Sequence, residues 1–190
     1  MHINWLKREI IFKIVYYGAG LSGKTTNLEY IYHKLAPDIR SELVSLKTTE
    51  DRTLYFDFMQ LDLGKIKNKR PRFHLYTVPG QIIYSRNRGP VISGADAFVF
   101  VVDSQKDRLF DNLASLMDLE QKLISSKKSL ENVPWVIQYN KRDLPTAESI
   151  DSMQKKYNFL NVPHFEAIAT RGVGVFETLK NIIRITMDNI

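Results

Sequence analysis

Residues 18–25 read Gly-Ala-Gly-Leu-Ser-Gly-Lys-Thr and match the pattern of a glycine, four further residues and then Gly-Lys-Ser/Thr. Its glycines let the backbone turn tightly, so that successive N–H groups point inward as a nest for an anion. In this pattern Lys24 reaches the terminal phosphates of a nucleotide, and the hydroxyl of Thr25 faces Mg²⁺. The stretch therefore predicts a phosphate-binding loop, or P-loop. The nucleotide contacts expected from it are those of Gly18, Gly20, Leu21, Ser22, Gly23, Lys24, Thr25 and Thr26.

The residues on either side of this loop supply the setting that the pattern requires. Residues 10–17 form an apolar, β-branched run that is typical of a buried strand. Residues 26–35 predict a helix, because Leu28, Ile31 and Leu35 fall on one face. The alternative is a glycine-rich turn that binds nothing, and the order of strand, loop and helix argues against it.

The rest of the chain continues to alternate strands with helices, apart from one hairpin. Further strands are expected at residues 53–61, 72–77, 95–103, 133–140 and 162–169. Helices are expected at residues 108–123, 149–157 and 175–187, with a short one at the end of the irregular segment 82–94. Residues 36–51 are polar without a clear period and predict a long loop. In the irregular segment we expect exposed side chains at Arg86, Asn87 and Arg88.

This order of elements predicts a single domain over residues 1–190 with the three-layer α/β architecture of P-loop NTPases. The expected sheet has six strands, mostly parallel, with one antiparallel strand from the hairpin at residues 53–77. About five helices would cover it. A ligand of such a sheet lies beyond the C-terminal ends of the strands, which is where the candidate motifs fall.

The composition is that of a globular chain without disulfides. Of the 190 residues, 44% are apolar and 25% charged, and there is no cysteine. This excludes disulfides, thiolate metal sites and cysteine nucleophiles, and it agrees with a cytoplasmic location. No apolar run approaches the roughly 20 residues of a membrane span. Residue 2 is His2 rather than the glycine of myristoylation, and the C-terminus lacks a prenylation cysteine, so we expect no lipid anchor.

The formal net charge of +6 is concentrated in the first half of the chain. It includes a basic cluster at residues 65–72, between two expected strands. The positive charge of this half would attract a phosphate-rich ligand, an anionic membrane or an acidic partner. A solvated hairpin tip explains the cluster equally well. No motif of a nucleic-acid-binding protein accompanies it, so we expect no nucleic-acid partner.

A second motif, Asn-Lys-Arg-Asp, occupies residues 140–143 directly after an expected buried strand. The carboxylate of Asp143 can accept hydrogen bonds from guanine N1–H and the exocyclic amine, whereas adenine has an acceptor at N1 and no amine at C2. A site that leaves a polar group unmatched discriminates strongly against the wrong base. Asn140 would tie the loops together, and Lys141 would lie over the base or brace the P-loop. The four residues therefore predict a pocket for guanine.

With these motifs in place, the chain resembles the Ras-like small GTPases over nearly its whole length. Gly80 and Gln81 resemble the end of the family's Asp-x-x-Gly-Gln signature, and Gly20 occupies its constricted P-loop position. Ala169 and Thr170 lie where the family has its Ser-Ala-Lys loop. The resemblance implies that Ala169 donates its backbone N–H to guanine O6. The side chains at positions 168 and 170 depart from the pattern.

The same resemblance implies binding of GTP and GDP with Mg²⁺ as the metal cofactor. Thr25 and Thr53 would be metal ligands, and Gln81 would orient the attacking water in a slow hydrolysis of GTP. Lys24 would stabilise charge on the transferred phosphate, and Arg52 is a candidate for an internal arginine that does the same.

One departure is more informative than the matches, because the family's metal-supporting Asp is Thr77 in this chain. Together with Arg52 and Thr53, it makes the sequence similar to the bacterial polarity GTPases of the MglA (mutual gliding) type. Thr77 brings no charge, so we expect weaker Mg²⁺ retention than with an aspartate there. Asp57 or Asp62 on the neighbouring strand could compensate for this loss.

The leading function is therefore a regulatory GTPase that switches between GDP and GTP states, with a role in bacterial cell polarity or motility. The alternative is a nucleotide-dependent binding module with negligible hydrolysis. Gln81 argues against that alternative because it can orient water. A small-molecule kinase is a third possibility, but the chain has no Arg-rich lid, and a kinase using ATP would not need Asp143.

The resemblance also implies partners and a location. We expect a GTPase-activating partner of the roadblock (MglB) type, and downstream effectors that contact residues 38–58 and 78–92. Residues 38–53 and 78–92 flank the γ-phosphate position, so we expect them to be mobile with GDP and more ordered with GTP. We expect a cytoplasmic protein that partners recruit to a cell pole.

Overall fold

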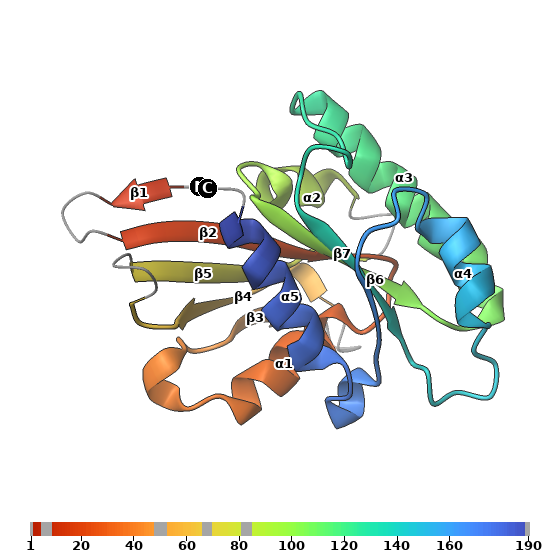
Figure 1. The fold of residues 1–190 in the computed structure, drawn as a ribbon, viewed down its shortest axis with the longest axis horizontal. Helices are drawn as coiled ribbons and strands as arrows, with labels where there is room; N and C mark the ends of the chain where they lie inside the picture. The colour runs from red at the N-terminus through yellow and green to blue at the C-terminus, as the bar shows by residue number, and fades with distance from the viewer. Residues whose placement is uncertain (1, 5–8, 48–52, 66–69, 81–84, 189–190) are drawn as a thin grey trace.

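The computed structural model describes residues 2–4, 9–47, 53–65, 70–80 and 85–188. Its strands are β1 (His2–Asn4), β2 (Glu9–Tyr17), β3 (Val44–Lys47), β4 (Thr53–Asp62), β5 (Arg70–Thr77), β6 (Ala97–Asp103), β7 (Trp135–Asn140) and β8 (His164–Glu166). Its α-helices are α1 (Lys24–Lys34), α2 (Ser85–Ile92), α3 (Leu109–Ser125), α4 (Ile150–Tyr157) and α5 (Val175–Asp188). Strands and helices alternate along the chain, and the three-layer α/β architecture is confirmed (Figure 1).

The strand before the P-loop, β2, lies at the centre of the sheet. It pairs in parallel with β5 on one side and with β6 on the other. Successive side chains of β2 point to opposite faces, as in any strand. Ile14 and Tyr16 therefore enter one core, whereas Val15 and Tyr17 enter the other, and all four are fully buried. This is why the run at residues 10–17 is apolar without alternation.

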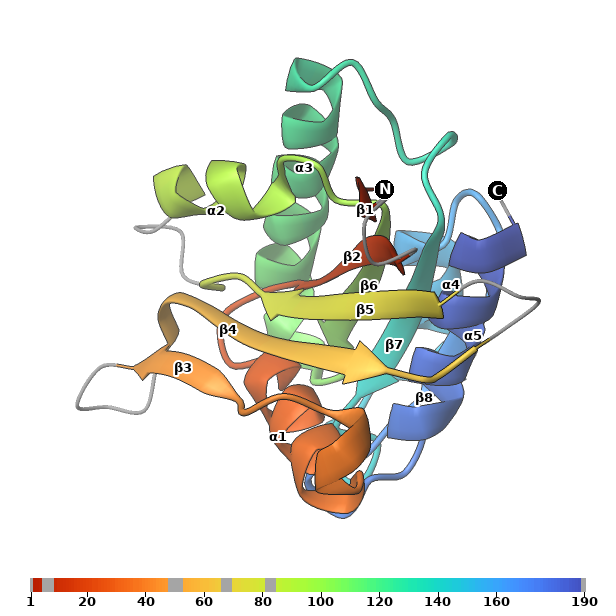
Figure 2. The same ribbon diagram turned by 90° about the vertical axis from the view of Figure 1, so that its left-hand side faces the viewer.

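The sheet of the described residues has the order β3-β4-β5-β2-β6-β7-β8, with β1 paired antiparallel to β2 outside this path. The expected antiparallel strand is β4, which runs against both β3 and β5 at the edge seen in Figure 2. Strands β1 and β3 are two more than the six expected. Each has four residues or fewer, too short for a period to show in the sequence. Residues 36–51, expected to be a loop, therefore contain β3, and a 3₁₀ turn at Pro37–Ile39.

Two apolar cores lie on the two faces of the sheet. The core under α1 and α5 contains Leu28 and Ile31 of α1 and Leu179 and Ile182 of α5. The core on the other face receives side chains of α2, α3 and α4, and in Figure 1 α3 lies above the sheet and α1 below it. None of the helices in the described part of the chain combines the length and apolarity needed to span a bilayer.

Arg88 on α2 corrects one expectation, because its side chain is 2% exposed rather than solvated. Its Nε donates to the carbonyl of Pro79 at 2.7 Å, and Nη1 donates to Asp118 Oδ2 on α3 at 2.6 Å. Nη1 also lies 3.1 Å from the hydroxyl of Tyr17. Asp118 and Tyr17 lie 30 and 71 positions from Arg88 in the sequence, so no local pattern indicates the burial. The contacts fix α2 and the end of β5 against α3.

We expect Arg88→Met to lower the free energy of unfolding by about 2 kcal/mol, because the carbonyl of Pro79 and one oxygen of Asp118 lose a buried hydrogen-bond donor, while Lys122 still pairs with Asp118. Burial favours a higher pKa for Asp118, but hydrogen bonds from Lys122 and Tyr17, with the charge of Arg88, hold that pKa below its usual value. Urea unfolding of Arg88→Met, Asp118→Asn and the double variant measures the coupling. Additive losses would contradict a direct interaction.

Candidate nucleotide-binding site

The P-loop leads from β2 into α1. Its last glycine, Gly23, begins the helix with a left-handed backbone (φ 99°), and a Cβ there would lie 2.1 Å from Asn140 Nδ2. Glycine alone meets both demands. Ser22 is buried in the same turn, and among the described residues its Oγ has no hydrogen-bond partner. Leu21, also left-handed at φ 64°, is exposed. A turn of this kind in front of a helix N-terminus suits the oxygens of a phosphate.

Lys24 is buried at the start of α1, and its Nζ donates to two P-loop carbonyl oxygens at 2.6 and 3.0 Å. Burial lowers the pKa of Lys24 to about 7; the charge of Arg88 adds to this, Asp57 opposes it, and Arg108 lowers it further. Phosphate oxygens beside Nζ would favour its charged form again. The positively charged side chains around Nζ therefore suit the binding of a polyphosphate.

The carboxylate of Asp57 accepts hydrogen bonds from three hydroxyl groups beside the P-loop. Asp57 on β4 is fully buried, and its Oδ2 accepts hydrogen bonds from Thr25 Oγ1 at 2.5 Å and Thr77 Oγ1 at 2.6 Å. Ser45 on β3 donates to the other carboxylate oxygen, Oδ1. Mg²⁺ prefers oxygen ligands of these types, so the residues present fit the metal.

Of the two carboxylates expected to compensate for Thr77, Asp57 lies at this site and Asp62 does not. Asp62 is the last residue of β4, where it accepts a hydrogen bond from the backbone of Gly64. It also forms ion pairs with Arg70 at 3.0 Å and Arg72 at 3.4 Å. These pairs engage Arg70 and Arg72 of the basic cluster at residues 65–72.

Asn140 at the end of β7 ties the loop at residues 140–143 to the P-loop. Its Nδ2 donates to the carbonyl of Ser22 at 2.8 Å. Its Oδ1 accepts the backbone N–H of Ala169 at 2.9 Å, which is the N–H expected to reach the base. One buried amide thus joins three loops at the C-terminal edge of the sheet, and the contact of Ala169 with guanine stays a prediction.

Lys141 braces the site through Asp103, a residue that the sequence analysis did not single out. The backbone of Lys141 is left-handed (φ 65°), and its Nζ donates to the buried Asp103 Oδ2 at 2.6 Å. Arg108 donates to the carbonyl of Gly20 at 2.8 Å and lies 3.7 Å from the same carboxylate. The position of Asp103 at the end of a buried strand is the signal that could have identified it.

Asp143 lies on the outer side of this loop with its side chain 28% exposed, 4.0 Å from the guanidinium of Arg171. Thr170, in the facing turn, is exposed. Both stand at the same edge as Asn140, and their contacts with a base stay predictions.

Gly80, after β5, packs directly on the P-loop. A Cβ on Gly80 would lie 2.5 Å from backbone atoms of Ala19 and Gly20, so glycine is required by close approach. Arg52 and Gln81 lie outside the described residues, as does the side chain of Thr53, the first residue of β4. Their assigned roles in catalysis and metal binding stay predictions.

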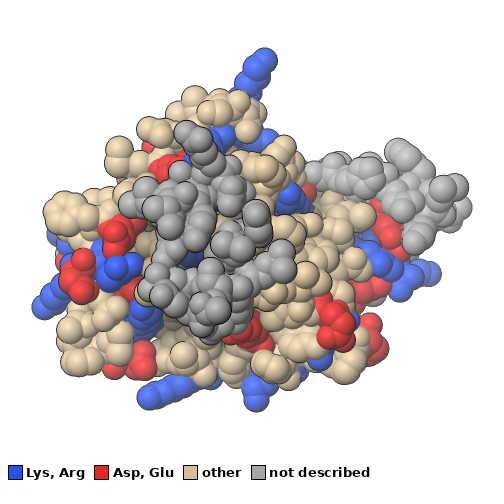
Figure 3. Space-filling view, turned by 180° about the vertical axis from the view of Figure 1, so that it is seen from behind, with Lys and Arg blue, Asp and Glu red and all other residues tan. Residues whose placement is uncertain are grey.

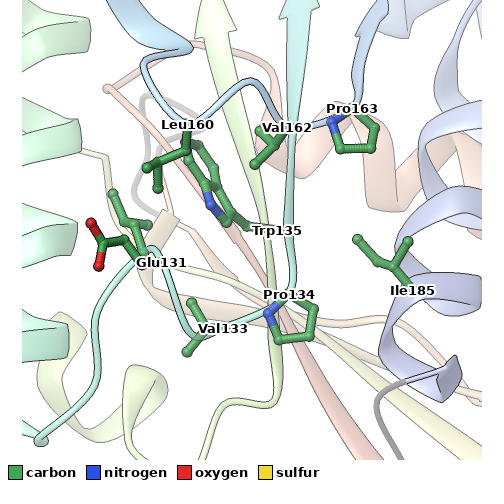
Figure 4. A pocket seen from close by; sticks show the side chains of 9 residues that line it. Glu131, Val133, Pro134, Trp135, Leu160, Val162, Pro163 and Ile185 are labelled. Carbon is green, nitrogen blue, oxygen red and sulfur yellow. The ribbon is translucent and has the colours of Figure 1, made fainter.

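A hollow of about 320 Å³ lies at the opposite end of the sheet, where β7 and β8 begin (Figure 4). Its lining is largely apolar: Leu130, Val133, Pro134, Trp135, Leu160, Val162, Pro163 and Ile185, with Glu131 at one side. Parallel sheets bind ligands at the C-terminal ends of their strands. The hollow therefore does not belong to the site built by the P-loop.

The face of the molecule shown in Figure 3 carries Lys and Arg side chains interspersed with Asp and Glu. Its described residues form no continuous stripe of one charge there. Such mixing is typical of a solvated surface rather than of a surface that follows a nucleic-acid backbone.

Comparisons with known proteins agree with this geometry. The model of the Arf family, described as the ADP-ribosylation factor family, matches residues 3–184. The chain is 50% identical over 188 residues to the mutual gliding-motility protein MglA of Myxococcus xanthus (strain DK1622), covering 99% of this chain and 96% of that protein. It is 25% identical over 185 residues to the Ras-related protein Rab7 of Pisum sativum, covering 94% and 83% of the two chains.

Proposed function

The chain belongs to the Arf and Ras-like family of small GTPases, and from that premise we propose that it is a switch that binds GDP and GTP and hydrolyses GTP. The observation that carries the proposal is the contact between Asn140 Nδ2 and the carbonyl of Ser22. This contact joins the loop at residues 140–143 to the P-loop at the C-terminal edge of the sheet, and it supports the proposal that one nucleotide binds to both loops.

Each part of the site has a task in this function. The P-loop N–H groups and Lys24 hold the phosphates, and Asp143 selects the base. Mg²⁺, when bound, would neutralise charge on the phosphates, and Thr25 would hold it. Gln81 would orient the attacking water. Arg108 and Lys141, joined through Asp103, keep the two loops in a fixed relation.

Thermal unfolding with GDP, GTP, ADP and ATP tests the binding half of the proposal. We expect guanine nucleotides with Mg²⁺ to raise Tm and adenine nucleotides to leave it unchanged, since ligands that bind only the folded state stabilise it. Equal shifts with ADP and GDP would contradict the proposal and favour the kinase.

Single-turnover hydrolysis of GTP, with and without the activating partner, separates the switch from a binding module with negligible hydrolysis. A slow intrinsic rate that the partner accelerates supports the switch. Undetectable hydrolysis in both conditions, with normal GTP binding, would support the binding module instead.

Cell polarity or motility is the cellular role that we propose, with a cytoplasmic protein brought to a cell pole by its partners. The support is the likeness to a protein of Myxococcus xanthus named for mutual gliding motility. An activating partner of the roadblock (MglB) type and effectors that contact residues 38–58 and 78–92 complete the proposal. The effector segments include β3 and the N-terminal part of β4, which carry Ser45 and Asp57 of the candidate site.

Ile83 gives a test of the partner surface. It lies with Ile82 and Tyr84 outside the described residues, in a segment of consecutive apolar side chains next to Gly80. We expect Ile83→Arg to weaken binding of the activator or of an effector by about tenfold, because buried apolar anchors carry much of an interface's energy. Nucleotide affinity should stay within about twofold, because residue 83 belongs neither to the P-loop motif nor to the motif at residues 140–143. Unchanged binding to every partner of the GTP form would remove this segment from the interface.

A further inference from the structure

We propose that Gln138 on β7 is a positioning residue for the nucleotide, and that it fixes the spacing between the P-loop and the turn at residues 169–174. The inference rests on the proposed function, because it concerns a ligand that contacts both loops. Gln138 and Asn140 lie two residues apart on β7, so their side chains point to the same face of the sheet. Asn140 joins the two loops at the edge of the sheet. Gln138 joins the helices that follow these loops, one layer deeper in the protein.

Gln138 and Asn27 of α1 exchange two hydrogen bonds between their side-chain amides. Asn27 Nδ2 donates to Gln138 Oε1 at 2.8 Å, and Gln138 Nε2 donates to Asn27 Oδ1 at 2.9 Å. Both residues are fully buried, so neither amide is open to solvent. Reversal of either amide would bring donor against donor and acceptor against acceptor, which fixes a single orientation of the pair.

Each end of this amide pair leads to the carbonyl of a glycine that precedes a helix. Asn27 Nδ2 also donates to the carbonyl of Gly23, the last glycine of the P-loop, at 2.9 Å. Gln138 Nε2 also donates to Thr178 Oγ1 on α5 at 3.0 Å, and that hydroxyl donates to the carbonyl of Gly174 at 2.6 Å. A chain of hydrogen bonds therefore connects the first turn of α1 to the first turn of α5 through β7.

The turn at residues 169–174 is packed as closely as the P-loop is. Gly174 has a left-handed backbone (φ 71°), and a Cβ there would lie 2.0 Å from the carbonyl oxygen of Glu166 at the end of β8. The corresponding atom on Gly23 would lie 2.1 Å from Asn140 Nδ2. Glycine at both positions lets the two loops lie directly against their neighbours. A shift of α1 or α5 is therefore transmitted to both loops of the proposed nucleotide site.

A fixed spacing of two loops matters only to a ligand that spans both. The base and the phosphates of GDP are joined covalently, so binding of one end presents the other end at a high effective concentration when the geometry is right. Guanosine and pyrophosphate each occupy one loop and gain nothing from the spacing. Apolar side chains could fill the place of the amide pair, but they would hold the helices without directional contacts. The amide pair between α1 and β7 therefore serves the affinity for the whole nucleotide.

Competition against fluorescent GDP, with the full chain and Mg²⁺, compares GDP with guanosine and with pyrophosphate. The test variant is Asn27→Leu with Gln138→Met, which replaces both amides by apolar groups of similar shape and leaves neither half of the pair unpaired. The carbonyl of Gly23 still accepts the backbone N–H of residue 27, and Thr178 still donates to Gly174. We expect the affinity for GDP to fall by about tenfold or more, while the affinities for guanosine and pyrophosphate each change by less than about twofold. Without nucleotide, Tm should stay within about 3 °C of that of the unmodified protein.

Thr178 supplies a second pair of variants, which carries the test if the double variant does not fold. Thr178→Val removes the hydroxyl that links Gln138 to α5, so we expect a loss of GDP affinity of about threefold to tenfold, with unchanged binding of guanosine and pyrophosphate. Thr178→Ser keeps the hydroxyl and should bind GDP within about twofold of the unmodified protein.

Asn158→Ala is the matched control for a purely structural effect. The side-chain amide of Asn158, buried at the end of α4, bonds both the N–H and the carbonyl of Val162 at the opposite end of the sheet. This substitution should lower Tm, because two backbone groups lose their partner. It should leave the affinities for GDP, guanosine and pyrophosphate unchanged.

An unchanged affinity for GDP in the double variant, or in Thr178→Val, would overturn the inference. Equal losses for GDP, guanosine and pyrophosphate would also overturn it, because they would show a general loosening of the site rather than a changed spacing. The inference is wrong as well if Asn158→Ala loses as much GDP affinity as the double variant, or if Thr178→Ser loses as much as Thr178→Val. The proposed function fails separately, if the unmodified protein binds no GDP.

Discussion

Asp143→Asn is expected to lower the affinity for GDP and GTP by about 100-fold or more and to favour xanthine nucleotides instead. Guanine presents N–H donors at N1 and at the exocyclic amine, and an ionised carboxylate accepts both. The asparagine amide replaces one acceptor by a donor, which faces the amine of guanine but suits the carbonyl of xanthine. The side chain of Asp143 is 28% exposed and stands at the same edge as the P-loop, so the change leaves the core intact.

Competition of unlabelled nucleotides against fluorescent GDP measures the change. Xanthosine diphosphate should displace the probe from Asp143→Asn at lower concentration than GDP does, and the unmodified protein should show the reverse order. Asp151→Asn, an exposed carboxylate in the first turn of α4, is the matched control and should behave as the unmodified protein. Undiminished GDP affinity in Asp143→Asn would remove this residue from the base pocket.

The parts of the fold that the sequence predicts are those encoded by neighbouring residues. The run at residues 10–17, the glycines of the P-loop and the spacing of Leu28 and Ile31 each determine structure within a few residues of themselves. The alternation of such elements then determines the layers, because parallel strands need helices to cross between them. For this reason β2, α1 and their order were predictable, whereas β1 and β3 were not.

The rest of the site depends on contacts between distant residues. Arg88 meets Asp118 across 30 positions, and its segment looks like an exposed basic loop in sequence. Asp57 contacts Thr25, which is 32 positions away in the sequence. The sequence alone therefore could not decide whether Asp57 or Asp62 compensates for Thr77, whereas the structure favours Asp57. Asp103 and Arg108 escaped notice because Lys141, which pairs with Asp103, and Gly20, whose carbonyl binds Arg108, lie on other loops. A buried charge is stable only with such partners, and no local pattern specifies them.

Arg52→Ala is expected to lower partner-stimulated GTP hydrolysis by about tenfold or more, and by up to ~10³-fold if Arg52 supplies the main cation. Charge develops on the phosphoryl group as it is transferred, and an arginine beside it stabilises that charge. Arg52 comes directly before Thr53, and adjacent residues of an extended segment point to opposite sides. With Thr53 as the proposed metal ligand, both side chains cannot face the nucleotide at once, and we therefore infer that β4 shifts when Arg52 acts.

The pairing of β3 with β4 gives that movement a physical basis. Ser45 pairs with Asp57 and Lys47 with Thr53, so the register advances two residues on β3 and four on β4. Such a bulge contains extra residues of β4 that are not paired with β3. If the bulge moved to another position along β4, the first residues of β4 would shift along the sheet. We infer that the activator stabilises the shifted arrangement rather than inserting an arginine of its own.

Single-turnover hydrolysis with saturating activator tests this mechanism, with Arg184→Ala on α5 as the control. Arg184 is exposed, lies outside residues 38–58 and 78–92 and pairs with Asp188 at 3.5 Å, so its loss should leave the stimulated rate within about twofold. The affinity of Arg52→Ala for GTP should stay within a few-fold, because the P-loop and Asp143 are unchanged. An unchanged stimulated rate in Arg52→Ala, or an essential arginine on the partner, would show that the catalytic cation comes from elsewhere.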